Sequence, residues 1–201
     1  MRIVVAGGGT AGWISAYIIE KSQPGVHDIT VVESSAIGII GAGEGSTGSL
    51  YDLVSGFFFD QFDEQKIHKF MEFTDSTYKF GINHVGWSSK RTGSYFAPLD
   101  RSRTGNMSPD LIFNYVLSNF GTEKAHLASY IGQSYDSNKF PGEAAFGFHF
   151  DAHKVGKYFR KELEKLANVN VIDAKINDVV LSQQGEISHL ILDQGKEVHG
   201  D

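Results

Sequence analysis

Short apolar runs and one helical repeat alternate at the start of this chain. Residues 2–6 form an apolar run that is typical of a strand buried on both faces. Residues 10–21 place apolar side chains at helical spacing, and residues 28–32 form a second apolar run. The pattern therefore predicts a strand, a helix and a second strand in the first 33 residues.

The turn between the first strand and the helix has the spacing Gly-x-Gly-x-x-Gly. Gly7 allows a tight turn, Gly9 lets a pyrophosphate approach the backbone, and Gly12 lets helix and strand pack closely. The helix start offers N–H groups and partial positive charge to phosphates. Glu33, 21 residues after Gly12, stands where an acidic residue accepts hydrogen bonds from an adenosine ribose. We expect NAD or FAD rather than NADP; the alternative is a glycine-rich turn followed by an ordinary surface glutamate.

The middle of the chain has a mixed pattern. We expect helices within 50–73, a strand at 83–85, a long loop at 86–107, a helix from 108 to 120 and another at 123–131. The basic residues of the loop are expected to be solvated, and an anion site is the alternative.

The last fifty residues begin with a helix and end with strands. Asp151 is expected to cap a helix over 152–167, whose lysine row we interpret as a solvated face: Lys154, Lys157, Lys161 and Lys165. Strands are predicted at 169–173, 176–182 and 187–192, and their spacing favours a small antiparallel layer.

Composition narrows the class of protein. Of 201 residues, 41% are hydrophobic and 21% charged, which is ordinary for a globular protein. The net charge of −6 gives no support for nucleic-acid binding. The absence of cysteine excludes disulfides, thiolate zinc sites and cysteine catalysis. With no apolar run of about 20 residues and no visible signal peptide, we expect a cytoplasmic protein that does not enter a membrane.

Two further segments are candidates for chemistry. Four glycines between Gly38 and Gly45 suggest a backbone held close to something flat or charged, and a flexible loop is the alternative. Lys79 lies between Tyr78 and Phe80, where a partly desolvated amine could donate a proton or act as a nucleophile. The alternative is a lysine that extends past its aromatic neighbours to water.

Histidines provide a weaker candidate. His149 and His153 are four residues apart and could share a helix face as metal ligands. His149 precedes the expected helix cap, however, and no third ligand is evident. We interpret both as structural or surface histidines.

Several motifs together resemble those of the flavin-dependent tryptophan halogenases. They are Gly-Gly-Gly-Thr-Ala-Gly-Trp at 7–13, Gly-Ala-Gly-Glu-Gly-Ser at 41–46, and Tyr-Lys-Phe-Gly-Ile at 78–82 with Trp87 shortly after. Phe-Asp-Ala at 150–152 also matches. The resemblance implies an α/β fold: a Rossmann-like, three-layer FAD-binding fold of the GR2 monooxygenase type, with added helices and a small antiparallel β layer. It implies one domain, with FAD-binding segments at about 1–50 and 150–201 around a helical and loop region at about 51–149.

The resemblance also implies a reaction and its site. Reduced FAD from a separate flavin reductase, oxygen and a halide would yield hypohalous acid. Lys79 would either hydrogen-bond this acid or become a haloamine, and so direct the halogen to an aromatic substrate such as tryptophan or an indole. The ADP half of FAD would contact Gly7, Gly9, Thr10, Ala11, Gly12 and Glu33. The flavin side would be lined by Gly43, Glu44, Gly45 and Ser46. The backbone at Val179 would meet the adenine. The resemblance further allows a homodimer.

The chain also departs from the family pattern. The family's Trp-x-Trp-x-Ile-Pro motif and the glutamate that works with the lysine are absent, and we expect both beyond Asp201. The fold is therefore expected to be incomplete at its C-terminal side, and this chain alone to be inactive. The alternatives are a non-catalytic FAD-binding fragment and another FAD-dependent monooxygenase. The identity of the substrate and of the halide stays open.

Overall fold

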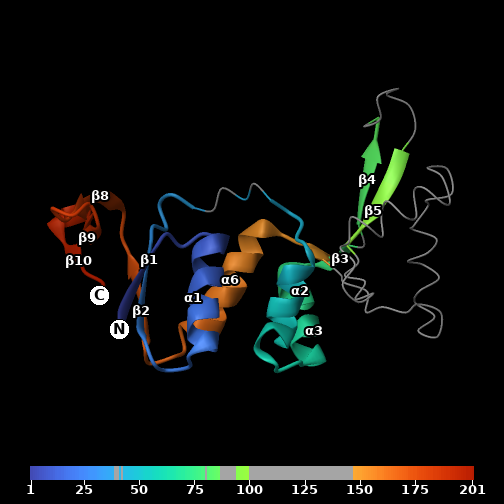
Figure 1. Ribbon diagram of the computed structural model, residues 1–201, viewed down its shortest axis with the longest axis horizontal. Helices are drawn as coiled ribbons and strands as arrows, with labels where there is room; N and C mark the ends of the chain where they lie inside the picture. Colours follow the sequence, from blue (N-terminus) through green and yellow to red (C-terminus); the bar gives the residue numbers. More distant parts are fainter. Residues whose placement is uncertain (39–40, 42, 80, 87–93, 100–146) are drawn as a thin grey trace. The chain divides into compact units, whose positions relative to one another are not determined.

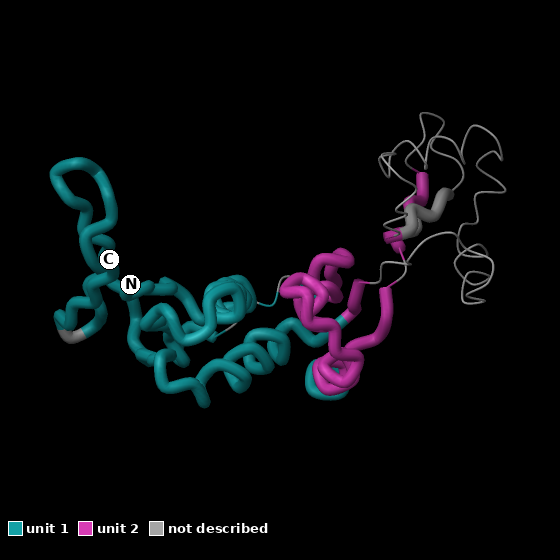
Figure 2. The backbone as a smooth tube through the Cα atoms, turned by 60° about the horizontal axis from the view of Figure 1, so that its bottom comes forward, with its two compact units in different colours: residues 1–44, 72–75, 150–201 teal, residues 45–71, 76–149 magenta. Residues whose placement is uncertain are grey.

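The computed structural model describes this chain as two compact units (Figure 2). The described residues are 1–38, 41, 43–79, 81–86, 94–99 and 147–201. The first unit comprises Met1–Glu44, Glu72–Asp75 and Phe150–Asp201, and the second comprises Gly45–Met71 and Ser76–His149. That the segments 1–50 and 150–201 bind FAD stays a prediction.

Three parallel strands form the central sheet of the first unit, in the order β1-β2-β7 (Figure 1). They span Arg2–Ala6, Asp28–Glu33 and Val169–Asp173. The middle strand β2 buries Ile29, Val31 and Val32 almost completely, because it has a strand on each edge and a layer on each face. The strands that the sequence pattern predicted here are confirmed.

Two helices cover one face of this sheet and lie side by side (Figure 1). They are α1 (Thr10–Ser22) and α6 (Ala152–Leu163). The rings of Tyr17 on α1 and Phe159 on α6 meet edge to face, with centroids 4.9 Å apart. Asp151 caps α6 as predicted, since its side chain accepts from the His153 N–H at 2.8 Å.

The helix α6 ends at Leu163, whereas the sequence pattern predicted a helix up to residue 167. A tertiary contact accounts for the early end. The side-chain amide of Asn168 donates to Glu20 Oε2 at 2.7 Å and to the His27 carbonyl at 2.9 Å. These bonds hold the start of β7 beside the turn that precedes β2, so the residues after Leu163 must turn toward the sheet.

A small antiparallel sheet forms the third layer, in the order β10-β9-β8. Its strands are β8 (Ile176–Leu181), β9 (Ile187–Leu192) and β10 (Glu197–Val198), with a short 3-10 turn η2 (Asp193–Gly195) before the last. Leu190 and Leu192 pack with Val32 of the central sheet in one buried cluster. The predicted antiparallel layer and the three-layer α/β fold are thereby confirmed.

The second unit is built around the buried ring of Phe148. Its elements include α2 (Gly48–Ser55), the 3-10 turn η1 (Phe57–Phe59), α3 (Glu64–Thr74, whose last turn belongs to the first unit), β3 (Thr77–Lys79) and β6 (Gly147–His149). The rings of Tyr51, Phe70 and Tyr78 surround Phe148, with centroids 5.9, 5.1 and 6.0 Å from its own. The helices predicted within 50–73 are confirmed.

The strand expected at 83–85 is confirmed, and a second strand corrects the long loop that was expected at 86–107. The strand β4 (Gly81–Val85) pairs antiparallel with β5 (Ser94–Pro98). Tyr95 and Phe96 favour strands, but glycine, serine and arginine around them hid the signal in the sequence. The helices expected at 108–120 and 123–131 lie outside the described residues. Among the described helices, none is long and apolar enough to cross a bilayer.

Candidate functional site

The glycines of the turn in the first unit differ in what requires them: the fold or a ligand. Gly7 has φ +114°, and its N–H donates to the Val32 carbonyl at 2.8 Å. A Cβ atom on Gly12 would overlap the Gly7 carbonyl oxygen, so only glycine lets α1 close on β1 here. At Gly9, by contrast, nothing lies within 4 Å of the Cβ position. The fold itself requires Gly7 and Gly12, whereas a demand for glycine at position 9 would come from a ligand.

The first turn of α1 is left open to a ligand. Gly9 is its N-cap residue and provides no side-chain cap, and the first turn holds no acidic residue. Thr10 Oγ1 donates to the Ala152 carbonyl at 3.4 Å, which ties this turn to the start of α6. Ala11 is exposed in the same turn. An uncapped helix start of this kind presents N–H groups to an anion.

A cavity of about 630 Å³ opens beside the glycine turn, which is a usual size for a small-molecule site. Its lining includes Gly7, Gly8, Gly9, Trp13, Glu33, Ser35, His153, Lys157 and Arg160. Among the residues expected to contact ADP, Gly7, Gly9 and Glu33 therefore border the cavity. Thr10, Ala11 and Gly12 are outside its described lining and belong to the adjoining helix turn.

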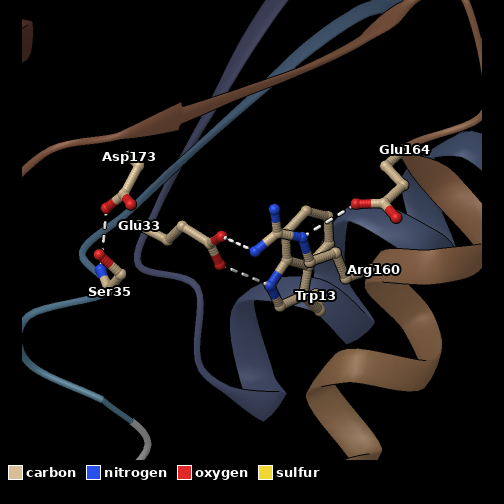
Figure 3. A network of polar contacts seen from close by, with 6 residues as sticks. All are labelled: Trp13, Glu33, Ser35, Arg160, Glu164 and Asp173. Carbon is tan, nitrogen blue, oxygen red and sulfur yellow. Dashed lines mark hydrogen bonds and ion pairs between the residues drawn. The ribbon is translucent and has the colours of Figure 1, made fainter.

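The carboxylate of Glu33 is held between two partners (Figure 3). Trp13 Nε1 donates to Glu33 Oε2 at 3.1 Å, and Arg160 Nη1 forms an ion pair with Glu33 Oε1. Trp13 is only 1% exposed, so its indole N–H needs an internal acceptor. The guanidinium of Arg160 lies over the Trp13 ring, 5.9 Å from its centroid, and its Nε donates to Glu164 at 3.0 Å. The hydrogen bond to Glu164 and the charge of Glu33 raise the pKa of Arg160 above its usual value.

Asp173 stands next to Glu33 at the carboxyl edge of the parallel sheet, one strand away (Figure 3). Its Oδ1 accepts from the Ser35 N–H at 2.8 Å. The backbone and side chain of Ser35, together with the charge of Arg160, lower the pKa of Asp173 below its usual value. This bond holds the chain that leaves β2 along one side of the cavity.

One face of α6 carries three basic side chains into the cavity lining: His153, Lys157 and Arg160. Lys157 is exposed, as expected for the solvated row, and it also lines the cavity. Its neighbours in that row do lie elsewhere, since Lys154 pairs with Asp75 and Lys165 with Glu162. The spacing i, i+4, i+7 was a signal in the sequence, but only the packing of α6 on α1 shows which face meets the cavity.

The loop residues of the first unit lie against α6 and the segment before it. The carbonyl of Glu44 accepts from the Phe150 N–H at 3.0 Å. Gly41, at φ +64°, leaves room for the His153 ring, which lies 3.1 Å from the position of a Cβ atom there. Gly43 has open space around the same position. Gly43 and Glu44 therefore expose backbone near α6, and their contact with a flavin stays a prediction.

Val179 lies on β8, the edge strand of the small sheet, and is 43% exposed. From this part of the chain the described cavity lining includes Ala174 and Ile176, not Val179. The expected backbone contact of Val179 with adenine stays a prediction.

In the second unit, strand alternation separates Lys79 from its aromatic neighbour. Tyr78 pairs with Phe148 in the β3–β6 register and stacks on its ring. Lys79 therefore points to the opposite face of the strand pair. Its Nζ lies 3.2 Å, and His149 Nδ1 lies 3.7 Å, from the position that a Cβ atom on Gly45 would take. The expected lysine thus comes next to one of the expected loop glycines.

Ser46 joins the loop to β6. Its N–H donates to the Phe148 carbonyl at 2.9 Å, and its Oγ accepts from the Phe148 N–H at 3.0 Å. A Cβ atom on Gly147 would lie 2.5 Å from the Ser46 carbonyl oxygen, so Gly147 allows this close approach. Gly45 and Ser46 are therefore fixed beside the strand pair that carries Lys79.

The two histidines that are four residues apart lie on different elements. His149 lies on β6 and His153 on α6, so the two do not share a helix face. Among the described residues, no group of three or more histidine, cysteine, aspartate or glutamate side chains could hold a metal ion.

The first unit fits the adenosine diphosphate half of a dinucleotide. The open Cβ position at Gly9 leaves room for a phosphate at the uncapped start of α1. The Glu33 carboxylate borders the same cavity and offers acceptors to sugar hydroxyls. Lys157 of α6 supplies positive charge in the lining of the same cavity.

Comparisons with known proteins agree with this geometry. The family model described as tryptophan halogenase matches residues 2–201. The chain is 28% identical to 7-chloro-L-tryptophan 6-halogenase KtzR of Kutzneria sp. (strain 744), over 99% of this chain and 43% of that protein. The structure of tryptophan 6-halogenase SttH from Streptomyces toxytricini superposes with a TM-score of 0.73 at 24% identity, over 100% of this chain and 40% of that one.

A further solved structure gives the same result. BrvH, a flavin-dependent halogenase from Brevundimonas sp. BAL3, matches with a TM-score of 0.66 at 26% identity, over 99% of this chain and 40% of that one. The chain thus spans about two fifths of the length of these relatives. Because the family model covers almost every residue, the chain belongs to the tryptophan halogenase family.

Proposed function

We propose that this chain supplies the FAD cradle and the lysine-bearing segment of a flavin-dependent halogenase that acts on an electron-rich aromatic substrate such as tryptophan or an indole. Two features found in one chain carry the proposal. The uncapped glycine turn lies beside a cavity, and the amine of Lys79 lies next to Gly45. Membership of the tryptophan halogenase family supports the reaction class.

In this proposal the ADP half of FAD binds in the first unit. The backbone at Gly7 and Gly9 and the N–H groups at Thr10, Ala11 and Gly12 would hold the pyrophosphate. Glu33 would accept hydrogen bonds from the ribose, and Val179 would contact the adenine through its backbone. Gly43, Glu44, Gly45 and Ser46 would line the flavin.

FAD, when bound in its reduced form, supplies the electrons with which oxygen and a halide yield hypohalous acid. A separate flavin reductase would provide the reduced cofactor. Lys79 would act as a hydrogen-bond donor that holds the hypohalous acid and directs its halogen to the aromatic ring. Gly45 supports this role, because its missing side chain leaves space at the Lys79 amine. A homodimer stays a prediction.

The proposal is tested on the full-length protein with a flavin reductase, halide, oxygen and a set of indoles, with products read by mass spectrometry. Lys79→Ala is expected to abolish halogenation while FAD binding and flavin oxidation remain. Lys69→Ala is the matched control, since Lys69 is an exposed lysine on α3. Halogenation retained by Lys79→Ala would contradict the proposal.

Two other outcomes separate the alternatives. A hydroxylated product from the unaltered protein would indicate another FAD-dependent monooxygenase. FAD binding without any turnover, under conditions in which the reductase is active, would indicate a binding protein.

A further inference from the structure

The carboxylate of Glu33 is fixed by contacts that are independent of any ligand. One oxygen accepts from the Trp13 indole and the other pairs with Arg160 (Figure 3). The side chain of Glu33 is only 14% exposed, so its rotation is restricted by what surrounds it. A carboxylate of this kind has a defined orientation before a ligand arrives.

The middle glycine of the turn contributes to this fixation. A Cβ atom on Gly8 would overlap both the Cβ and the Oε2 atoms of Glu33. The Glu33 side chain therefore lies directly on the backbone of Gly8. The dinucleotide fingerprint gives this position no role, so the steric demand comes from Glu33.

The count of hydrogen-bond acceptors shows what Glu33 can still bind. An ionised carboxylate has about four lone-pair sites, two on each oxygen. Trp13 occupies one on Oε2 and Arg160 occupies one on Oε1. One acceptor site per oxygen remains, at a residue that borders the cavity. Two neighbouring acceptors fit two neighbouring O–H donors.

We propose that Arg160 and Trp13 are positioning residues that hold Glu33, seated on Gly8, so that its two remaining acceptor sites select a nucleotide ribose with a free 2′,3′-cis-diol. The inference rests on the proposed dinucleotide cradle and names the residues that orient its acidic side chain. A 2′-phosphate brings only acceptors and negative charge to Glu33, and a 2′-deoxy sugar lacks one donor.

Arg160 is poorly placed to reverse this preference by binding a 2′-phosphate itself. Its Nη1 is engaged by Glu33 and its Nε by Glu164. Asp173, at the same sheet edge, adds a third negative charge that acts on the guanidinium. The charge of Arg160 is therefore matched within the protein, which leaves orientation of Glu33 as its role.

The test measures binding of three probes to the full-length protein by calorimetry: ADP, 2′-deoxy-ADP and adenosine 2′,5′-bisphosphate. The unaltered protein is expected to prefer ADP to 2′-deoxy-ADP by about ten- to a hundredfold, as for a hydrogen bond to a charged acceptor. It is expected to bind the bisphosphate more weakly than either.

Variants separate positioning from direct contact. Arg160→Gln and Trp13→Phe are expected to reduce the preference for ADP over 2′-deoxy-ADP to less than about threefold. Arg160→Lys, which keeps the charge, should restore part of it. In a Glu33→Gln background, Arg160→Gln should change the ratio no further, because Arg160 acts through Glu33. Lys157→Gln, on the same helix face, should weaken both nucleotides equally and leave the ratio unchanged.

The outcomes distinguish the inference from the proposed function. If ADP binds the unaltered protein without preference over 2′-deoxy-ADP, the inference is overturned while the cradle stands. Arg160→Gln could instead weaken the binding of all three probes equally, in a variant that melts at the same temperature as the parent. This result would also overturn the inference and indicate that Arg160 contacts a phosphate. If neither ADP nor FAD binds at all, the cradle and the inference both fall.

Discussion

Gly12 lies so close to Gly7 that the carbonyl oxygen of Gly7 fills the space where a Gly12 side chain would be. This contact joins the first turn of α1 to the end of β1. The N–H of Gly7 in turn binds the Val32 carbonyl on β2. Two glycines thus connect a helix and two strands at the corner where the cavity opens.

The first prediction compares Gly12→Ala with Gly9→Ala. Gly12→Ala is expected to destabilise the protein by about 1–3 kcal/mol, because the methyl group must push α1 from β1. Gly9→Ala should change the free energy of unfolding by less than about 1 kcal/mol, because its Cβ position is open. Urea denaturation measures both.

The same pair separates folding from binding. Gly9→Ala is expected to weaken FAD binding at least tenfold in a folded protein, since its methyl group would occupy the approach of the pyrophosphate. A Gly9→Ala protein that binds FAD normally would show that the phosphates lie elsewhere.

The second prediction concerns Gly45 and Lys79. A methyl group at Gly45 would lie 3.2 Å from Lys79 Nζ, so the flexible amine must move. Gly45→Ala is expected to lower the halogenation rate of the full-length enzyme by about tenfold or more, as a displaced reacting group does, while the melting temperature stays within a few degrees. An unchanged rate in Gly45→Ala would argue against a catalytic Lys79.

The third prediction tests the core of the second unit. Phe148 is fully buried among three aromatic rings, and Phe148→Ala should cost about 3–5 kcal/mol of stability. Phe58, which is 60% exposed, provides the matched control, and Phe58→Ala should stay within about 0.5 kcal/mol. Similar losses in both variants, measured by chemical denaturation, would contradict this assignment of the core.

The fourth prediction concerns pH. Ser35 and Arg160 lower the pKa of Asp173 in the folded state, so the ionised form stabilises the fold. This contribution is present above the ordinary aspartate pKa of 3.8 and is lost as the pH falls through the lowered value. Asp173→Asn should therefore be less stable than the parent at pH 7 and equal to it in strong acid. The difference should be small, because Asp173 is exposed.

Ser35→Ala provides a graded control for this prediction. It removes the hydroxyl donor but keeps the backbone N–H that bonds to Asp173. Its stability between pH 3 and pH 7, measured by urea denaturation, should lie between those of the parent and Asp173→Asn. A stability difference for Asp173→Asn that does not change with pH would contradict the assigned cause.

The sequence alone predicted the elements whose signals are local. The apolar runs, the glycine spacing and the helical repeat of the first 33 residues correspond to β1, α1 and β2 with almost the same bounds. Asp151 marked the start of α6, because capping depends on neighbouring residues only. The strands predicted at 169–173, 176–182 and 187–192 also formed, because their apolar runs and the turns between them are local signals.

Tertiary packing decided the features that join distant residues. Glu33 meets a guanidinium 127 positions later, and no local pattern pairs the two. Lys157, on an exposed face of α6, lines the cavity because α6 packs on α1. The early end of α6 and the strand β5 likewise depend on partners outside their own segments.

Local sequence patterns therefore determined the strands, the helix and the glycine turn of the first 33 residues. The tertiary structure decided which side chains hold Glu33. Backbone preferences and side-chain spacing act within a few residues, so a sequence displays them directly. An ion pair or a strand pairing depends on which segments meet in space, and that follows from burial of the whole apolar surface. For this reason Glu33 could be named from the sequence, while Gly8, Trp13 and Arg160 acquired their roles around it only in the folded chain.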